Sequence, residues 1–322
     1  MNAINVENVN KIFQRYVKQD GILKNFFHRQ YEEKTAIHDM SFQIQKGECV
    51  AIIGQNGAGK TTLMKLLSGL LLPTTGRVEV LGYVPFKKEK EYKKKITLLL
   101  GQKQQLWWDI SAQDNFVLLK DIYELEDEEY KRNLNELITM LEIEKIINNP
   151  IRTLSLGERM KCELAGSLLH KPSVLFLDEP TIGLDLIAQN DVRKFIKNYS
   201  ETNQATVLLT SHNMDDIEEV CKRTIFIENG KKYYDGTLSD FIVQYGEDGI
   251  LNVEYMGNID EVEWEKYGEV IKKENNLIKI RISKRDKNQI RQEIINISGV
   301  IHITFSELEA EEIVREFYKK ER

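Results

Sequence analysis

The chain has 322 residues, of which 41% are hydrophobic and 30% are charged, and its formal net charge is −6 at pH 7. That length predicts one large domain with a smaller one attached. The negative charge argues against nucleic acid as the main partner, because such binding relies on clustered Lys and Arg. The three cysteines are isolated in the sequence, which predicts buried thiols in a reducing compartment rather than disulfides or metal ligands.

Membrane insertion is not indicated by the sequence. No apolar run approaches the ~20 residues that a membrane-spanning helix needs. The first ten residues lack the basic start and apolar middle of a signal peptide. We therefore expect a cytosolic chain that reaches a membrane only through a partner.

The N-terminal region alternates between apolar and polar residues in two places, Ile4–Val9 and Met40–Ile44, as half-buried strands do. Between them, residues 20–34 predict an amphipathic helix, because apolar residues recur every four positions within Ile22–Tyr31. Such a helix could pack on its own domain or lie against a membrane or a membrane protein.

A phosphate-binding loop is predicted next. The stretch GECVAIIG predicts a short buried strand that runs into the glycine turn GQNGAGKTT, and residues 60–71 predict a helix. The turn fits G-x-x-x-x-G-K-[ST], with the strand before it and the helix after it that this motif requires. Glycines let successive backbone N–H groups face inward and cradle phosphate oxygens, and the helix N-terminus adds partial positive charge. An ordinary glycine turn is the alternative. The candidate phosphate-binding residues are Gly54, Gln55, Asn56, Gly57, Ala58, Gly59, Lys60, Thr61 and Thr62. Among them Lys60 should reach the β- and γ-phosphates, and Thr61 should ligate Mg²⁺.

Residues 112–148 predict helices, and two short apolar runs follow, SVLFLDEP and ATVLLTSH. Runs of that length that end in polar residues predict central parallel strands with a site at their carboxyl ends. Asp178 could hold the hydration shell of Mg²⁺, and Glu179 could polarise an attacking water. An Asp-Glu pair after a strand is often only a loop cap, but the phosphate loop upstream favours the functional interpretation.

The C-terminal part of the chain differs in character. Asn229 and Gly230 predict a hairpin turn between two strand-like flanks. After about Thr237, alternating segments predict strands near residues 251–255, 278–282 and 301–305, with helices near residues 290–297 and 308–318. This pattern predicts a small α+β domain, and it contains no catalytic constellation.

Together with LSLGE at Leu154–Glu158, these motifs follow the order found in the nucleotide-binding subunits of ABC transporters. Residues 1 to about 236 resemble that family. The resemblance implies an α/β P-loop fold with a parallel central sheet and an antiparallel edge. It implies an ATPase domain at residues 1–236 that includes a helical subdomain at about 103–170, followed by a C-terminal accessory domain at 237–322. The implied substrate and cofactor are ATP and Mg²⁺.

The LSLGE turn resembles the family's LSGGQ signature, which closes over the γ-phosphate held by the partner chain. The resemblance therefore implies nucleotide contacts in the opposite subunit for Ser155, Leu156, Gly157 and Glu158. Leu156 replaces the first glycine of the family pattern, and Glu158 replaces its glutamine. Added bulk and added negative charge could each weaken ATP-driven closure.

The roles of four further residues are implied by the resemblance alone. Phe13 would stack on adenine, with Tyr16 as the less well aligned alternative. Gln102 would reach Mg²⁺ and the attacking water. Asp185 belongs to the Gly-Leu-Asp loop that crosses to the partner subunit. His212 would sense the γ-phosphate and orient the catalytic glutamate.

Trp107 and Trp108 follow the glutamine loop, where the family docks its membrane partner. They could anchor that contact. The alternative is core packing of one or both rings.

The function implied by the resemblance is ATP hydrolysis that powers transport through a separate multi-span permease. Details of the motifs resemble the prokaryotic branch that serves ABC-2-type permeases, often exporters. The implied assembly has a second ATPase subunit and lies on the cytoplasmic face of the cell membrane. A soluble ABC ATPase that moves no solute is the alternative, but the chain has neither a long coiled-coil insertion nor a second ATPase core. A non-hydrolysing sensor would be expected to lose Glu179 or His212, and both are present.

Overall fold

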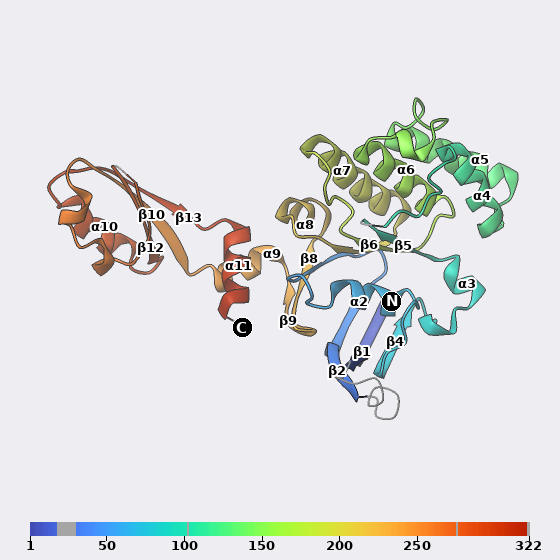
Figure 1. Cartoon of the computed structure of the whole chain (residues 1–322), viewed down its shortest axis with the longest axis horizontal. Helices are drawn as coiled ribbons and strands as arrows, with labels where there is room; N and C mark the ends of the chain where they lie inside the picture. The colour runs from blue at the N-terminus through green and yellow to red at the C-terminus, as the bar shows by residue number, and fades with distance from the viewer. Residues whose placement is uncertain (18–29, 102, 275, 321–322) are drawn as a thin grey trace. The chain divides into compact units, whose positions relative to one another are not determined.

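The computed structural model describes residues 1–17, 30–101, 103–274 and 276–320 (Figure 1). The chain divides into two compact units, Met1–Gly236 and Thr237–Arg322. Each unit has its own sheet and its own buried apolar cluster.

The larger unit is built on a six-stranded sheet whose strands are parallel except for the last, an antiparallel edge. In spatial order the strands are β5 (Ile96–Leu100), β6 (Val174–Asp178), β7 (Thr206–Thr210), β3 (Cys49–Ile53), β8 (Arg223–Glu228) and β9 (Lys231–Gly236). Strands β6 and β7 are buried along almost their whole length, which explains why their sequences are continuous apolar runs. The predicted α/β fold with an antiparallel edge is confirmed.

The β8–β9 hairpin turns at Asn229 and Gly230, as predicted. Both residues have positive φ, 49° and 76°. A two-residue turn with two positive φ angles matches the right-handed twist of the flanking strands, which is why Asn-Gly is favoured there.

Helices cover both faces of this sheet. Figure 1 shows α2 (Lys60–Leu67) on one side and α6 (Leu156–Leu168), α7 (Leu186–Asn203) and α8 (Met214–Val220) on the other. The short helix α3 (Lys90–Lys93) precedes β5. Helices α4 (Ala112–Tyr123) and α5 (Asp127–Leu141) lie with α6 in the segment between β5 and β6. Short 3-10 turns lie at Pro85–Lys87 and Ile151–Thr153. Among the described residues, no helix combines the length and apolar character needed to cross a bilayer.

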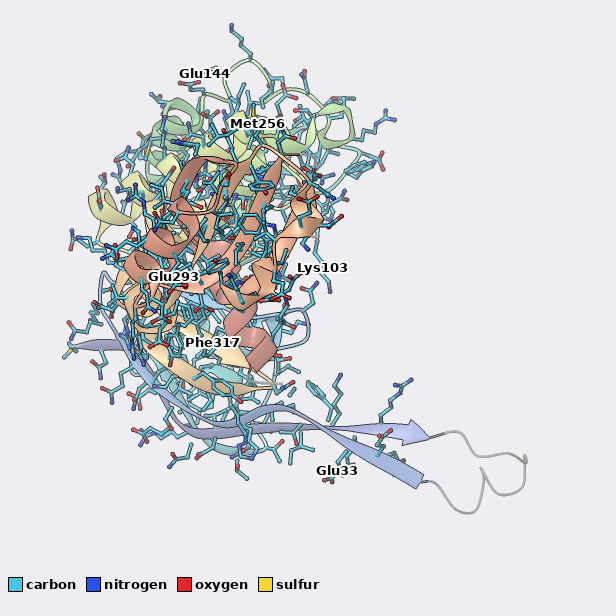
Figure 2. The ribbon with its side chains drawn as sticks, turned by 90° about the vertical axis from the view of Figure 1, so that its left-hand side faces the viewer. Glu33, Lys103, Glu144, Met256, Glu293 and Phe317 are labelled. Carbon is cyan, nitrogen blue, oxygen red and sulfur yellow. The ribbon has the colours of Figure 1, made fainter. Side chains whose placement is uncertain are left out.

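A second, antiparallel sheet has the order β2 (Gln30–Gln45), β1 (Asn2–Val17), β4 (Thr75–Val80). The helix predicted at residues 20–34 is wrong where the structure describes it, because residues 30–34 belong to β2. Tyr31 pairs with Tyr16, and Glu33 pairs with Gln14. Cross-strand pairing with β1 replaces the helical periodicity here. Residues 18–29, with most of the predicted stripe, lie outside the described residues. Figure 2 shows the β1–β2 hairpin extending beyond the rest of its unit, with Glu33 on its outer part.

The smaller unit has a four-stranded antiparallel sheet of order β11 (Glu269–Glu274), β12 (Leu277–Ser283), β10 (Asp248–Tyr255), β13 (Val300–Glu307). The sheet and α10 (Lys287–Ile295) enclose a core around Trp264, which is fully buried. Helices α9 (Leu238–Tyr245) and α11 (Ala310–Lys320) meet through the Phe241 and Phe317 rings, whose centroids are 5.2 Å apart. Two 3-10 turns, Ile259–Glu261 and Trp264–Lys266, complete the unit.

His170, directly after α6, is buried and predicts acid sensitivity. Its Nε2 bonds to the Ile96 carbonyl at 3.0 Å, and its ring stacks on Tyr123 with centroids 3.7 Å apart. Burial lowers the pKa of His170 from 6.5 to about 4, so the folded state resists protonation that the unfolded state accepts.

We expect the free energy of unfolding to fall as pH drops from about 6.5 to 4, by roughly 3 kcal/mol in total from this residue. The sign follows because the unfolded chain binds the proton at a higher pH than the folded chain does. Urea unfolding at a series of pH values measures the effect. His170→Gln can still donate to Ile96 but cannot titrate, so its free energy of unfolding should fall by about this amount less over the same pH range, which gives a flatter slope. Equal slopes for the two proteins would disprove the assignment.

Candidate functional site

The phosphate-loop candidate joins β3 to α2 through a tight backbone curl. Gly59 has φ +110°, and a β-carbon there would approach the Ala36 carbonyl oxygen to 2.6 Å. A β-carbon on Gly54 would lie 2.5 Å from the Ile227 carbonyl oxygen. Close backbone approach therefore requires glycine at both positions, and at Gly59 the positive φ favours glycine as well. The loop begins at the carboxyl edge of the parallel sheet, where such folds place their ligands.

Lys60 extends into the curl of this loop and is 6% exposed. Its Nζ donates to the Gly54 carbonyl at 2.6 Å and to the Gln55 carbonyl at 3.3 Å. Burial lowers the pKa of Lys60, while the nearby Glu179 and Asp178 carboxylates act in the opposite direction. The ammonium group is thus held inside the loop by neutral oxygens that an anionic ligand could replace, and it also lies 3.1 Å from His212 Nε2.

Thr61 and Asp178 face one another across the site although 117 positions separate them in sequence. Thr61 Oγ1 donates to Asp178 Oδ2 at 2.7 Å, and Thr210 Oγ1 donates to Asp178 Oδ1 at 2.6 Å. Two of the three predicted metal ligands therefore lie within hydrogen-bond distance of one another, and the third, Gln102, is outside the described residues. Oxygen donors of this kind, an alcohol beside a carboxylate, fit Mg²⁺.

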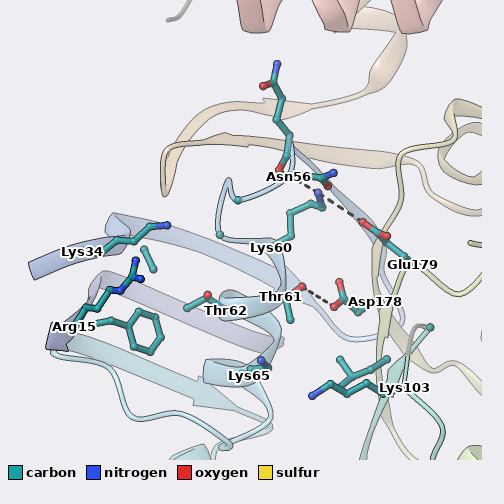
Figure 3. A pocket seen from close by; sticks show the side chains of 17 residues that line it. Arg15, Lys34, Asn56, Lys60, Thr61, Thr62, Lys65, Lys103, Asp178 and Glu179 are labelled. Carbon is teal, nitrogen blue, oxygen red and sulfur yellow. Dashed lines mark hydrogen bonds and ion pairs between the residues drawn. The ribbon is translucent and has the colours of Figure 1, made fainter. Parts of the chain in front are cut away.

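Glu179 and His212 form a second pair, at the ends of adjacent strands β6 and β7. Glu179 Oε1 lies 2.8 Å from His212 Nε2 and 3.8 Å from Lys60 Nζ (Figure 3 shows the latter pair). Burial is the main cause of a lowered pKa at His212, and Lys60 lowers it further. Glu179 has a left-handed backbone with φ 55°, an uncommon conformation for this residue type that is typical of functional positions.

Lys60, Thr61, Asp178 and Glu179 line a pocket of about 540 Å³ (Figure 3), and His212 adjoins its lining through Glu179. Phe13, 38% exposed, lines it on the β1 side. Tyr16, the alternative, is described only as a strand residue paired with Tyr31. Four further cations line the pocket, and none forms an ion pair within the described part of the chain: Arg15, Lys34, Lys65 and Lys103. A pocket with that surplus of positive charge suits a polyanionic ligand such as a triphosphate.

Ser155 caps α6 and forms a capping box with Glu158. The Glu158 N–H donates to Ser155 Oγ at 3.3 Å, and the Glu158 carboxylate accepts the Ser155 N–H at 2.8 Å. Hydrogen bonding to Ser155 lowers the pKa of Glu158. The glutamate that replaces the family's glutamine therefore turns back onto its own helix, a local role that the sequence comparison with LSGGQ did not reveal.

The start of α6 packs against the segment that leads into α7. A β-carbon on Gly157 would lie 2.9 Å from Ala188 Cβ, so this close approach requires glycine. Leu156 lies beside Gly183, whose built β-carbon would be 3.3 Å from Leu156 Cδ2. Asp185 Oδ1 accepts the Ala188 N–H at 2.9 Å and caps α7.

A family model described as "ABC transporter" matches residues 37–182. The ABC transporter ATP-binding protein NatA of Bacillus subtilis is 34% identical over 214 residues, which are 65% of this chain and 87% of NatA. The chain belongs to the ABC transporter family. It is an ATP-binding subunit and an ATPase of that family.

Two other comparisons agree with this membership. The linearmycin resistance ATP-binding protein LnrL of Bacillus subtilis is 32% identical over 227 residues, 70% of this chain and 72% of LnrL. A solved structure titled "Structure of ATP binding subunit of ABC transporter" is 25% identical, with a TM-score of 0.63, and covers 76% of this chain and 93% of the other. The resemblance proposed from the motifs is confirmed.

The structure brings together the phosphate loop, Asp178, Glu179, His212 and Phe13, while Ser155–Glu158 do not line their pocket. Gln102 lies outside the described residues. Thr210 was missed from the sequence, although it holds both Asp178 and the Glu179 N–H, the latter at 3.1 Å from its Oγ1. Its signal was weak: a threonine at the end of the strand next to the Asp-Glu strand.

Proposed function

We propose that this subunit hydrolyses ATP to drive export through a separate multi-span permease of the ABC-2 type. The observation that carries the proposal is a pocket lined by Lys60, Glu179 and the Thr61–Asp178 pair, in which Glu179 also contacts His212. Export is supported by the printed name of LnrL, a linearmycin resistance protein. Such a subunit would lie on the cytoplasmic face of the membrane, held there by the permease.

In this proposal the phosphates of ATP enter the curl of Gly54–Thr62, and Lys60 exchanges its carbonyl partners for phosphate oxygens. Thr61 and Asp178 would hold Mg²⁺, which neutralises phosphate charge when it is bound. Phe13 offers a ring on which adenine can stack. The expected contact of Gln102 with Mg²⁺ and water stays a prediction.

Glu179 is suited to the chemical step, since its carboxylate lies beside the phosphate-loop lysine and is fixed by His212. A positioned carboxylate can accept a proton from the attacking water. With its lowered pKa, His212 is neutral near pH 7, so it can donate one hydrogen bond and accept another. This arrangement supports hydrolysis rather than nucleotide binding alone.

A dimer of two ATPase units, either a homodimer or a pair with a similar chain, is part of the proposal. Ser155 is exposed, and its hydroxyl accepts from the α6 backbone, so its proton can be donated outward. The α6 N-terminus carries partial positive charge and can contact an anion. A γ-phosphate held by a second subunit would be such an anion.

The permease contact is proposed at a groove of about 700 Å³ beside α4 and α6. Its apolar lining includes Leu98, Leu106 and Ile122. Four lysines also line it, of which Lys90 and Lys94 pair with Glu124: Lys88, Lys90, Lys93 and Lys94. A cytoplasmic helix of the permease that presents apolar and acidic residues would match this lining.

Trp107 and Trp108 lie close to this groove in sequence and are 57% and 40% exposed, so neither packs in the core. Buried side chains hold the loop rigidly. Asn115 bonds to both the N–H and the C=O of Trp107, at 2.6 and 3.0 Å, and Glu163 accepts the Leu106 N–H at 3.3 Å. Exposed rings on a fixed loop suit an interface anchor, because a loop that is already ordered loses little conformational entropy on binding.

We expect Trp107→Ala and Trp108→Ala to weaken permease binding, at least one of them by roughly 30-fold, since truncated aromatic anchors typically cost about 2 kcal/mol. Basal ATPase activity of the isolated subunit should not change. Pull-down with the permease in detergent and an ATPase assay give the two readouts. Tyr233→Ala, which truncates an exposed aromatic on β9, is the control. If both tryptophan variants bind the permease as well as wild type does, this loop is not part of the docking surface.

The proposal as a whole is tested by reconstitution. When it is co-expressed with the permease, the subunit should co-purify with it from membranes. Its rate of ATP hydrolysis should be higher in the complex than in the isolated subunit. ATP hydrolysis without membrane association would favour a soluble ATPase instead.

A further inference from the structure

A buried carboxylate stands behind the Glu179–His212 pair. Asp216, in α8, is 1% exposed. Its Oδ2 accepts hydrogen bonds from Ser211 Oγ, at 2.6 Å, and from Thr181 Oγ1, while its Oδ1 accepts from Arg193 Nη1 at 3.1 Å. All three donors are themselves buried, between 2% and 6% exposed. A buried carboxylate is stable only when it is bonded in this way.

The position of these donors in the chain is informative. Ser211 directly precedes His212, and Thr181 follows Glu179 by two residues. One carboxylate therefore joins the two backbone segments whose side chains meet at 2.8 Å in the site. Arg193 fixes the carboxylate in turn from α7.

We propose that Asp216 is a positioning residue for ATP hydrolysis, which sets the separation between the backbone at Glu179 and the backbone at His212. The inference rests on the proposed role of these two residues. Glu179 has an unfavourable left-handed backbone, and such a conformation persists only where its surroundings hold it.

The hydrogen bonds around the pair supply that restraint. The Glu179 N–H donates to the Thr210 carbonyl at 3.0 Å. Two residues further on, the Thr181 hydroxyl donates to the Asp216 carboxylate. On the other side of the pair, Ser211 Oγ accepts the Asn213 N–H at 3.0 Å while donating to Asp216. His212 thus lies in a turn that the Asn213 N–H closes onto Ser211 Oγ, and Ser211 ties this turn to Asp216.

Asp216→Asn tests the idea in the full-length protein. The amide keeps the shape of the side chain but removes the charge opposite Arg193, and its NH₂ group cannot accept from Ser211 or Thr181. We expect kcat for ATP hydrolysis to fall at least about 10-fold, with the Kd for ATP within about 2-fold of wild type. A residue that only stabilised the fold would lower ATP binding and the melting temperature together and would not separate kcat from Kd.

A double-mutant cycle distinguishes positioning from general loss of structure. In a His212→Ala background, measured under single-turnover conditions, Asp216→Asn should change the remaining rate by less than about 2-fold. Glu219→Gln is the matched control. Glu219 bonds to the same Arg193 but its side chain is 45% exposed, and its variant should keep kcat within about 2-fold.

Thr181→Val and Ser211→Ala provide a second route if Asp216→Asn does not fold, because both leave the Asp216–Arg193 pair. Thr181→Val removes one side-chain bond to Asp216, whereas Ser211→Ala removes the bond to Asp216 and the bond from the Asn213 N–H. Each should lower kcat by several-fold with ATP binding retained. Wild-type kcat in these variants, or an equal loss of rate in the presence and absence of His212, overturns the positioning role. Failure of the proposed function would look different, since the wild-type protein itself would then not hydrolyse ATP.

Discussion

Replacement of Glu179 by glutamine should nearly abolish ATP turnover while ATP binding is kept. Glutamine preserves the size of the side chain and can still meet His212, but it cannot accept a proton from water. General-base contributions are typically 10²- to 10⁴-fold, so we expect kcat to fall by at least about 100-fold. Phosphate release and fluorescent-nucleotide binding measure the two quantities.

The same variant should hold two subunits together with ATP between them, because hydrolysis no longer reopens the site. Light scattering after gel filtration, at saturating ATP and Mg²⁺, reports the mass. Glu218→Gln, an exposed carboxylate on α8, should behave as wild type in every assay. A Glu179→Gln protein that stays monomeric with and without the permease would contradict the proposed composite site.

Lys60→Ala should affect the step before chemistry. The Lys60 ammonium lies 2.6 Å from the Gly54 carbonyl, inside the phosphate loop, where it would meet charge that ATP carries before any reaction. Charge-assisted hydrogen bonds typically contribute about 1.5–3 kcal/mol, so we expect the Kd for ATP to rise by at least about 10-fold. Isothermal titration calorimetry measures it, with Lys222→Ala as an exposed-lysine control.

The contrast between the two variants is the informative result. Lys60→Ala should lose binding, and turnover with it, whereas Glu179→Gln should lose turnover alone. Equal loss of ATP binding in both would mean that the ground-state and reaction roles have been assigned to the wrong residues.

Much of the site was predictable because it consists of short motifs at the ends of elements. The phosphate loop needs glycines at Gly54 and Gly59, and strand β6 needs an apolar run before Asp178. Such requirements are local, so they can be read from a few adjacent letters. The order of the motifs then indicated the family.

The parts that sequence reasoning missed depend on contacts between distant segments. Residues 30–34 end the stretch for which a four-residue apolar repeat predicted a helix, yet pairing with β1 makes them a strand. Asp216 looks like any acidic residue in the first turn of a helix, and only the folded chain brings Thr181 and Arg193 to it. Glu158 differs again, because its capping box is a local pattern that comparison with the LSGGQ glutamine concealed.

The packing of Leu156 beside Gly183, and of Gly157 against Ala188, has a mechanical consequence. Two segments that we propose to face a second ATPase subunit are in contact within one chain. A neighbour that pushes on the loop before α7 must therefore also push on the start of α6, since close-packed groups transmit displacement rather than absorb it. Approach of the second subunit would then displace both segments together. A state in which one segment is docked and the other is free would have a higher free energy than either the open or the fully docked state.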